Sequence, residues 1–196
     1  MAAMILLALS TALAPGPVRA EADSISGRFD TGHSEVSFRI RHFMSRVRGR
    51  FDQWQGTLVA DPSNMANGSV DVTIQSGSIN TSHERRDNDL RSANFFLVDS
   101  FPIITFKSRR VEVRDSALRI TGDPTIKNIT REVVLEGLFL GSTGRPEPRQ
   151  QRIGFTAATT IDRTHFGIVW NWAVEGGGLM LGDEVEIEVN IEAVRQ

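Results

Sequence analysis

The sequence predicts an all-β domain: a closed antiparallel barrel of about eight strands with a short helical insert at one end. Three observations predict this fold. Apolar and polar residues alternate along most of the chain, as in half-buried strands. The alternating runs are short and closely spaced, and almost no helix is available for parallel crossovers, so we expect antiparallel strands. We prefer a barrel to a two-sheet sandwich, because closure removes unpaired edges and about eight strands can enclose one small ligand.

Residues 1–20 are expected to be a signal peptide. Met4 to Leu13 is apolar, Pro15 and Gly16 interrupt it, and Val18-Arg19-Ala20 has small residues where a signal peptidase cleaves. The apolar run is shorter than the ~20 residues that span a bilayer, which disfavours the alternative of an amino-terminal anchor. Residues 21–196 then form one domain, expected in the periplasm or secreted.

Composition narrows the function classes. The 196 residues carry a formal net charge of −2, so no global positive field favours nucleic acid as a partner. There is no cysteine, which excludes thiolate catalysis and zinc–thiolate sites. An exported domain without disulfides must be stabilised by its core.

Four alternating runs precede the insert, and each predicts a strand with one core side and one wet side. The expected turns between the later runs are Asp61-Pro62 and Asn67-Gly68. The residues expected to face the core are, in order, Val36, Phe38, Ile40 and His42, then Val47, Gly49 and Phe51, then Val70, Val72 and Ile74, and Gly56 to Ala60 continues the alternation between the last two sets.

Residues 85–108 contain the one change of period in this β-rich pattern. Charges from Arg85 to Asp89 are spaced as on a helical turn, and Phe95-Phe96 follows to anchor the junction. Pro102 prevents the helix from continuing, and Ile104 to Lys107 alternates as a strand. We expect a short surface helix across one end of the barrel, placed as a lid.

The second half predicts further strands. A hairpin turn is expected at Arg114-Asp115-Ser116, a loop around Gly122-Asp123-Pro124 and an exposed loop from Gly141 to Gln151. The inward rows are expected at Val111 and Val113, at Leu118 and Ile120, at Val133, Leu135 and Gly137, at Ile153, Phe155, Ala157, Thr159 and Ile161, at Ile168, Trp170, Trp172 and Val174 before Gly176-Gly177-Gly178, and at Val185, Ile187, Val189 and Ile191.

Two rows of charge are expected to meet where the barrel closes. The outward faces of the early strands carry arginines, and the outward face of the last strand carries glutamates, so the rows can form cross-strand pairs. The rows are Arg39, Arg41, Arg46, Arg48 and Arg50 on one side and Glu184, Glu186, Glu188 and Glu192 on the other.

The ordered motifs of the chain resemble those of the YceI-like family, exported lipocalin-like proteins described as polyisoprenoid- or lipid-binding. The resemblance covers about Phe29 to Ala193. Pro124 and Asn128 depart from the family pattern, which has Leu and Gly there; Asn tolerates left-handed backbone, and Pro124 indicates a changed loop. The motifs are Asp30-Thr-Gly-His33-Ser34, Phe38, His42, Val47-Arg-Gly49-Arg-Phe51, Gly56, Ser78-Ile-Asn-Thr81, Arg86-Asp87, Leu90, Phe95-Phe96, Phe101 to Ser108, Thr125 to Thr130, Arg163 to Gly167 and Gly182 to Val185.

The resemblance implies an extended lipocalin-like barrel around a long apolar tunnel for an isoprenoid, quinone or fatty-acyl chain. The protein would carry or sequester that lipid, with transient membrane contact, and a homodimer is left open. The alternative is an interaction module whose barrel is filled by its own side chains. The residues expected to line the tunnel are Phe38, Ile40, His42, Val72, Ile74, Phe106, Phe155, Ile161, Trp170 and Trp172.

Five polar residues are expected near the tunnel mouth, where an arginine fork suits an oxyanion headgroup. They are Arg86, Asp87, Arg91, Arg163 and His165. For Arg86 and Asp87 the alternative is an ion pair that fixes the helix or its loop, and for His42 it is a hydrogen-bonded core position.

No catalytic or metal site is expected. Ser34 follows His33, but adjacent strand residues face opposite sides, and no Gly-x-Ser-x-Gly elbow is present. The four histidines show none of the spacings of a metal site. We therefore predict a binding protein without enzymatic activity and without a cofactor.

Overall fold

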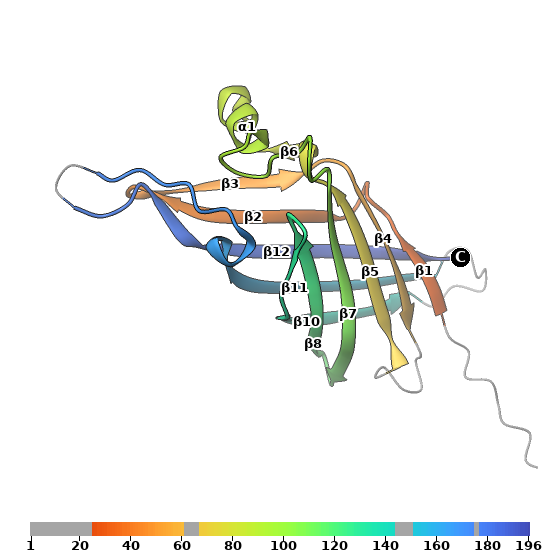
Figure 1. Ribbon diagram of the computed structural model, residues 1–196. Coiled ribbons are helices and arrows are strands. Elements are labelled where there is room, and N and C mark those ends of the chain that lie inside the picture. The colour runs from red at the N-terminus through yellow and green to blue at the C-terminus, as the bar shows by residue number, and fades with distance from the viewer. Residues whose placement is uncertain (1–24, 61–66, 144–150, 175–176) are drawn as a thin grey trace, which may run out of the picture.

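The computed structural model describes residues 25–60, 67–143, 151–174 and 177–196, and in them an eight-stranded antiparallel barrel is closed (Figure 1). Closure comes from β1 pairing with the end of β12, where Gly27 lies opposite Arg195. The predicted all-β barrel is thereby confirmed. The ring strands are, in spatial order, β1 (Ile25–Phe29), β4 (Trp54–Ala60), β5 (Ser69–Gln75), β7 (Ile103–Arg114), β8 (Ala117–Ile126), β10 (Val133–Thr143), β11 (Arg152–Asp162) and β12 (Leu181–Arg195).

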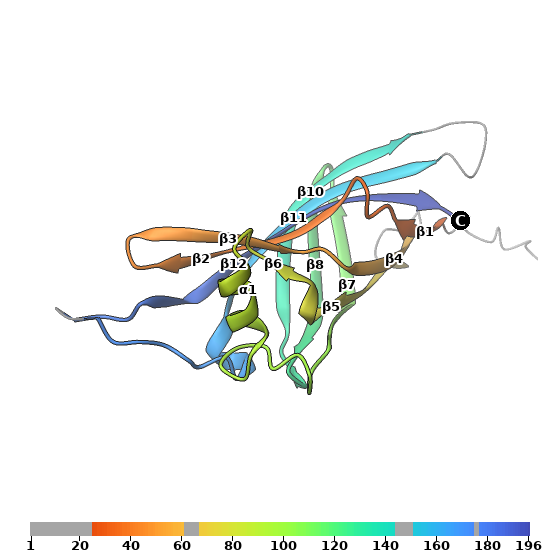
Figure 2. The same ribbon diagram turned by 90° about the horizontal axis from the view of Figure 1, so that it is seen from above.

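An arm projects from this ring. The amino-terminal part of β12 pairs with β2 (Glu35–His42), which forms a hairpin with β3 (Ser45–Phe51). The short β6 (Ile79–Asn80) continues the arm, and β9 (Ile129–Thr130) pairs with the end of β8. Both views show the β2–β3 hairpin and the start of β12 extending beyond the barrel (Figures 1 and 2).

The predicted charge rows lie side by side on this arm. Arg39 is 2.8 Å from Glu188 and 3.9 Å from Glu186, and Arg46 also pairs with Glu186. The rows join β12 to β2 and β3, whereas the ring itself closes through β1. Each exposed pair is worth a few tenths of a kcal/mol, so the rows support register more than stability.

The helical insert is present as α1 (Glu84–Arg91). His83 begins it, because its Nδ1 accepts a hydrogen bond from the backbone N–H of Arg86. Phe95 after the helix is buried, as expected for an anchor. Short 3₁₀ turns precede the insert at Ser76–Ser78 and follow β11 at Arg163–Phe166. No helix in the described residues is long and apolar enough to cross a membrane.

The loop predicted at Gly122-Asp123-Pro124 is wrong, because all three residues belong to β8. A strand residue points its N and C=O to the same side, and the Pro124 carbonyl accepts from the backbone N–H of Arg131. The missing N–H of Pro124 therefore costs no bond to β7. The turn comes later, at Lys127 and Asn128, both with positive φ.

The strand predicted from Ile168 to Val174 is also wrong. That segment is irregular and contributes one isolated bridge, between Ala173 and Leu179. The predicted loop from Gly141 begins as part of β10. The expected signal peptide, the Asp61-Pro62 turn, residues 144–150 of that loop and Gly176 lie outside the described residues.

Two apolar clusters of buried side chains lie at the two ends of the barrel. One, around Phe29, Leu58 and Phe155, packs the end where β1 meets β12. The other gathers at the end covered by the insert and includes Phe95 and Phe166. Residues of both clusters line an internal cavity.

Candidate functional site: an apolar cavity inside the barrel

The barrel encloses a cavity of about 320 Å³. It extends from Phe29 and Trp54 in one cluster to Leu90 and Phe96 of the helical insert. A volume of this order is within the range of small-ligand pockets. The lining is predominantly aliphatic and aromatic, and its few polar or charged residues are Ser37, His42, Arg86, Asp89, Thr105, Thr159 and Arg163.

The structure brings nine of the ten expected tunnel residues together around this cavity. Trp172 is the exception, with 63% of its surface exposed. Alternation predicted that Trp172 points inward, but the segment that contains it is not a strand. The Trp172 backbone N–H instead donates to the Asn171 side chain. The nine residues that line the cavity are Phe38, Ile40, His42, Val72, Ile74, Phe106, Phe155, Ile161 and Trp170.

Three phenylalanine rings in the wall pack over glycines of neighbouring strands. A β-carbon on Gly49 would lie 2.7 Å from Phe38 Cε1, and one on Gly122 would lie 2.5 Å from Phe106 Cζ. Phe29 covers Gly56 in the same way. The missing side chains let the rings lie close to the sheet, which leaves the middle of the barrel open.

The insert is fastened over one end of the cavity by its charged side chains. Arg86 Nε and Nη2 donate to Oγ1 and the carbonyl of Thr81 at 2.7 and 2.8 Å, and Asp87 Oδ1 accepts from the Thr81 backbone N–H at 2.8 Å. Arg91 donates to the carbonyls of Gly77 and Ile79. Asp87 is buried, and of these three residues only Arg86 lines the cavity. The geometry therefore favours the alternative in which Arg86 and Asp87 fix the loop. They do so through Thr81 rather than by a direct ion pair.

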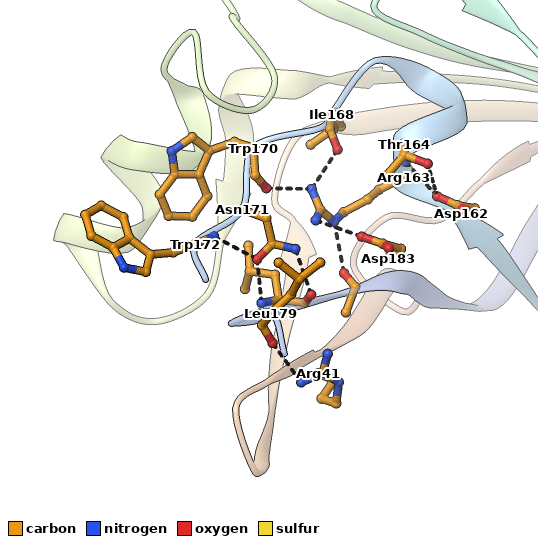
Figure 3. Close-up of polar contacts among 12 residues, drawn as sticks. Arg41, Asp162, Arg163, Thr164, Ile168, Trp170, Asn171, Trp172, Leu179 and Asp183 are labelled. Atoms are coloured by element: carbon orange, nitrogen blue, oxygen red, sulfur yellow. Dashed lines mark hydrogen bonds and ion pairs between the residues drawn. The ribbon is translucent and has the colours of Figure 1, made fainter. Parts of the chain in front are cut away.

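Arg163 organises the segment between β11 and β12 (Figure 3). Its side chain is 4% exposed, and the guanidinium donates to the carbonyls of Ile168, Trp170 and Gly182 at 2.6 to 2.9 Å. It also donates to Asp183 at 3.0 Å. With these bonds made, Arg163 borders the cavity as a structural residue rather than as a free headgroup ligand.

His165 and His42 differ in surroundings. His165 is exposed, 3.8 Å from Asp162, and does not line the cavity. The pKa of Asp162 is lowered, chiefly by the hydroxyl hydrogen bond from Thr164. His42 lines the cavity at the end of β2, and its ring has no hydrogen-bond partner within the described chain. The alternative of a hydrogen-bonded core position for His42 stays a prediction.

Sequence reasoning missed part of the lining. Trp54 begins the alternation that Gly56 and Leu58 continue, so the same period could have placed it inward. Phe96 was expected only as an anchor of the insert and Leu90 only as a family motif, and their place at the cavity required knowing where the insert folds back.

A polar cluster outside the barrel joins β1, β11 and β12. Arg152 donates to Asp30 at 2.8 Å and to Glu192, and His33 lies 3.0 Å from Asp30. These bonds, with that from Arg152 first, lower the pKa of Asp30 from its ordinary value near 3.8 to about 2. Asp30, His33 and Glu192 could together face a cation, but the Arg152 guanidinium already binds both carboxylates. Ser34 Oγ donates to the Glu192 carbonyl rather than to His33.

The family model described as "YceI-like domain" matches residues 28–193, which is almost the whole described barrel. The chain belongs to the YceI-like family. A UPF0312 protein of Staphylococcus aureus strain MSSA476 is 39% identical over 165 residues, covering 84% of this chain and 94% of the relative.

Solved structures share the fold. A YceI protein of Campylobacter jejuni matches with a TM-score of 0.69 at 26% identity, over 78% of this chain and 87% of that one. BcnA of Burkholderia cenocepacia matches with a TM-score of 0.71 at 20% identity, over 84% and 98%. A domain of Saccharophagus degradans described as polyisoprenoid-binding matches with a TM-score of 0.63 at 13% identity, over 88% and 99%.

Proposed function

We propose that this YceI-like protein binds one long-chain apolar lipid, of isoprenoid, quinone or fatty-acyl type, inside its barrel. The observation that carries the proposal is the internal cavity of about 320 Å³ with its aliphatic and aromatic wall. Each methylene buried there gains ~0.8 kcal/mol, so a chain binds tightly without directional contacts. The description of the Saccharophagus degradans domain as polyisoprenoid-binding agrees with this choice of ligand class.

The proposed role is carriage or sequestration rather than catalysis. The cavity offers few polar groups, and the serine and histidine next to each other in sequence are bonded to other partners. We propose that the protein works in the periplasm or outside the cell after cleavage near Ala20. Fractionation and intact-mass measurement check this: protein in the exported fraction should begin close to Glu21.

Native mass spectrometry of the purified protein, followed by organic extraction, tests ligand binding. A stoichiometric additional mass that extracts as a prenyl or acyl lipid supports the proposal. Protein without this mass that also fails to take up added quinones, polyprenols and fatty acids contradicts it and favours the interaction module with a filled barrel.

A pair of variants locates the ligand. Ile40 lines the cavity, whereas Ile103 begins β7 and is exposed. Ile40→Trp should reduce bound lipid several-fold because the indole occupies ligand space, and Ile103→Trp should leave it unchanged. Equal loss in both variants, or in neither, would place the ligand elsewhere.

A further inference from the structure

The end of the arm is an exposed apolar surface that the lipid cavity does not use. We call it the apolar tip and define it by Phe43, Met44, Trp172 and Leu179, each an exposed large hydrophobic residue. Hydrogen bonds hold its segments together: the Phe43 N–H donates to the Met180 carbonyl at 2.8 Å, and the Met180 N–H to the Trp172 carbonyl at 2.9 Å. The β2–β3 hairpin, whose turn carries Phe43 and Met44, extends beyond the barrel beside the start of β12 (Figures 1 and 2).

The turn that forms the tip is built from unusual residues. Phe43 and Met44 occupy the two-residue loop between β2 and β3, where Asn, Asp and Gly normally predominate. Phe43 has a φ of 52°, a left-handed backbone that a bulky residue adopts at a cost. Apolar side chains are thus presented to solvent at a position where polar residues would fold more easily.

The cavity leads to this tip. His42 and Met180 both line the cavity, and each is the immediate chain neighbour of a tip residue, Phe43 and Leu179. The His42 and Phe43 rings also pack edge to face, with their centroids 4.9 Å apart. The wall of the cavity therefore reaches the base of the tip.

Charge at the base of the tip suits a phosphate-bearing surface. Arg41 Nη1 donates to the carbonyls of Phe43 and Leu179 at 3.2 and 3.3 Å, and within the described chain its Nε and Nη2 have no partner (Figure 3). Of the two acids near the start of β12, Asp183 is bonded to Arg163, and Glu184 is exposed. Arg41 at the base and the exposed Trp172 are residue types that anchor proteins at a bilayer interface.

We infer that the apolar tip docks onto the surface of a lipid bilayer containing anionic phospholipid and that lipid enters the cavity from there. Four side chains at a narrow end present much less than the ~800 Å² per partner of a stable protein interface, which disfavours a second copy. They suit shallow, reversible insertion. The inference rests on the proposed function and adds where the ligand is loaded.

The absence of cysteine makes a site-specific test straightforward. Met44→Cys and Leu140→Cys each receive one polarity-sensitive nitrobenzoxadiazole label; Leu140 is an exposed leucine on β10, away from the tip. With vesicles of phosphatidylcholine and phosphatidylglycerol, the label at position 44 should brighten and shift to the blue, and the label at 140 should not. Both proteins carry the same amino terminus, so its contribution cancels.

Vesicle sedimentation supplies a second readout. Phe43→Ser with Met44→Ser should weaken binding by about tenfold, since two anchors leave the bilayer. Leu138→Ser with Leu140→Ser is the matched control and should bind as the unchanged protein does. The tip variant should still bind a fatty acid delivered in solution, while uptake from vesicles slows, so failure of docking and failure of lipid binding are distinguishable.

Three results would overturn the inference. One is an unchanged label at position 44 in the presence of vesicles. Another is equal sedimentation of the tip and control variants. The third is a label shift that depends on protein concentration without vesicles, accompanied by dimer formation in analytical ultracentrifugation, which would assign the tip to a second copy.

Discussion

Phe38 packs directly over Gly49, its partner across the β2–β3 hairpin. A β-carbon on Gly49 would lie 2.7 Å from Phe38 Cε1 and 2.9 Å from Thr81 Cγ2, so the Phe38 ring occupies the space where a side chain at position 49 would lie. Since Phe38 also lines the cavity, the absence of one side chain on β3 influences the width of the lipid site.

Gly49→Ala should therefore destabilise the protein by about 1–3 kcal/mol and push Phe38 into the cavity. Urea denaturation measures the first effect and lipid uptake the second. Gly77→Ala is the control, because a β-carbon there meets nothing within 4 Å. Adding Phe38→Leu to Gly49→Ala should restore part of the stability; no recovery would mean that the ring is not the obstruction.

Arg163 should prove a structural residue. Replacing it with Gln removes hydrogen bonds to three carbonyls and Asp183, and we expect a loss of about 3 kcal/mol in the free energy of unfolding. Hydrogen exchange should accelerate in residues 168–182. Arg119→Gln, which breaks an exposed pair with Glu136, should cost less than about 1 kcal/mol. An Arg163→Gln protein with normal stability and impaired lipid binding would instead support the hypothesis that Arg163 binds the lipid headgroup.

The charge rows permit a reversal experiment. Glu186→Lys faces Arg39 and Arg46, so it should destabilise by up to about 1 kcal/mol. Arg46→Glu should recover part of this, because Arg46 pairs with Glu186, whereas Arg39 also pairs with Glu188. Arg41 bonds backbone carbonyls instead and is not a suitable partner for rescue. Absence of coupling in the double-mutant cycle, measured by urea denaturation, would show that the rows contribute nothing.

The Asp30 cluster predicts an acid-sensitive junction. The pKa of Asp30 is lowered to about 2 by hydrogen bonds from Arg152 and His33, and the unfolded value is near 3.8. The stabilisation is thus present above about pH 4 and is lost as the pH falls toward 2. Asp30→Asn should flatten this part of the stability profile, measured by thermal unfolding between pH 2 and pH 5. Asp99→Asn, at an exposed position, should leave the pH dependence of stability unchanged. An equal flattening in Asp99→Asn would contradict the assignment of this pH dependence to Asp30.

Much of the fold followed from the alternation of apolar and polar residues. The period of two identified β2, β7, β11 and β12 and placed Phe38, Phe106 and Phe155 inward, because a strand turns successive side chains to opposite faces. The same rule failed at Trp172. There the bonds of Arg163 and Asn171 to distant carbonyls replace a regular ladder, and no local pattern reveals such bonds.

The sequence by itself determined the class of fold, the family and the apolar character of the interior, since these depend on residue type and local period. Only the tertiary structure decided that the ring closes through β1, that space remains between the packed clusters, and that Phe43, Met44, Trp172 and Leu179 share one exposed end. The reason is physical. Closure, cavity volume and surface patches depend on contacts between residues far apart in the chain. The alternation along one strand does not determine which strands or loops lie beside it.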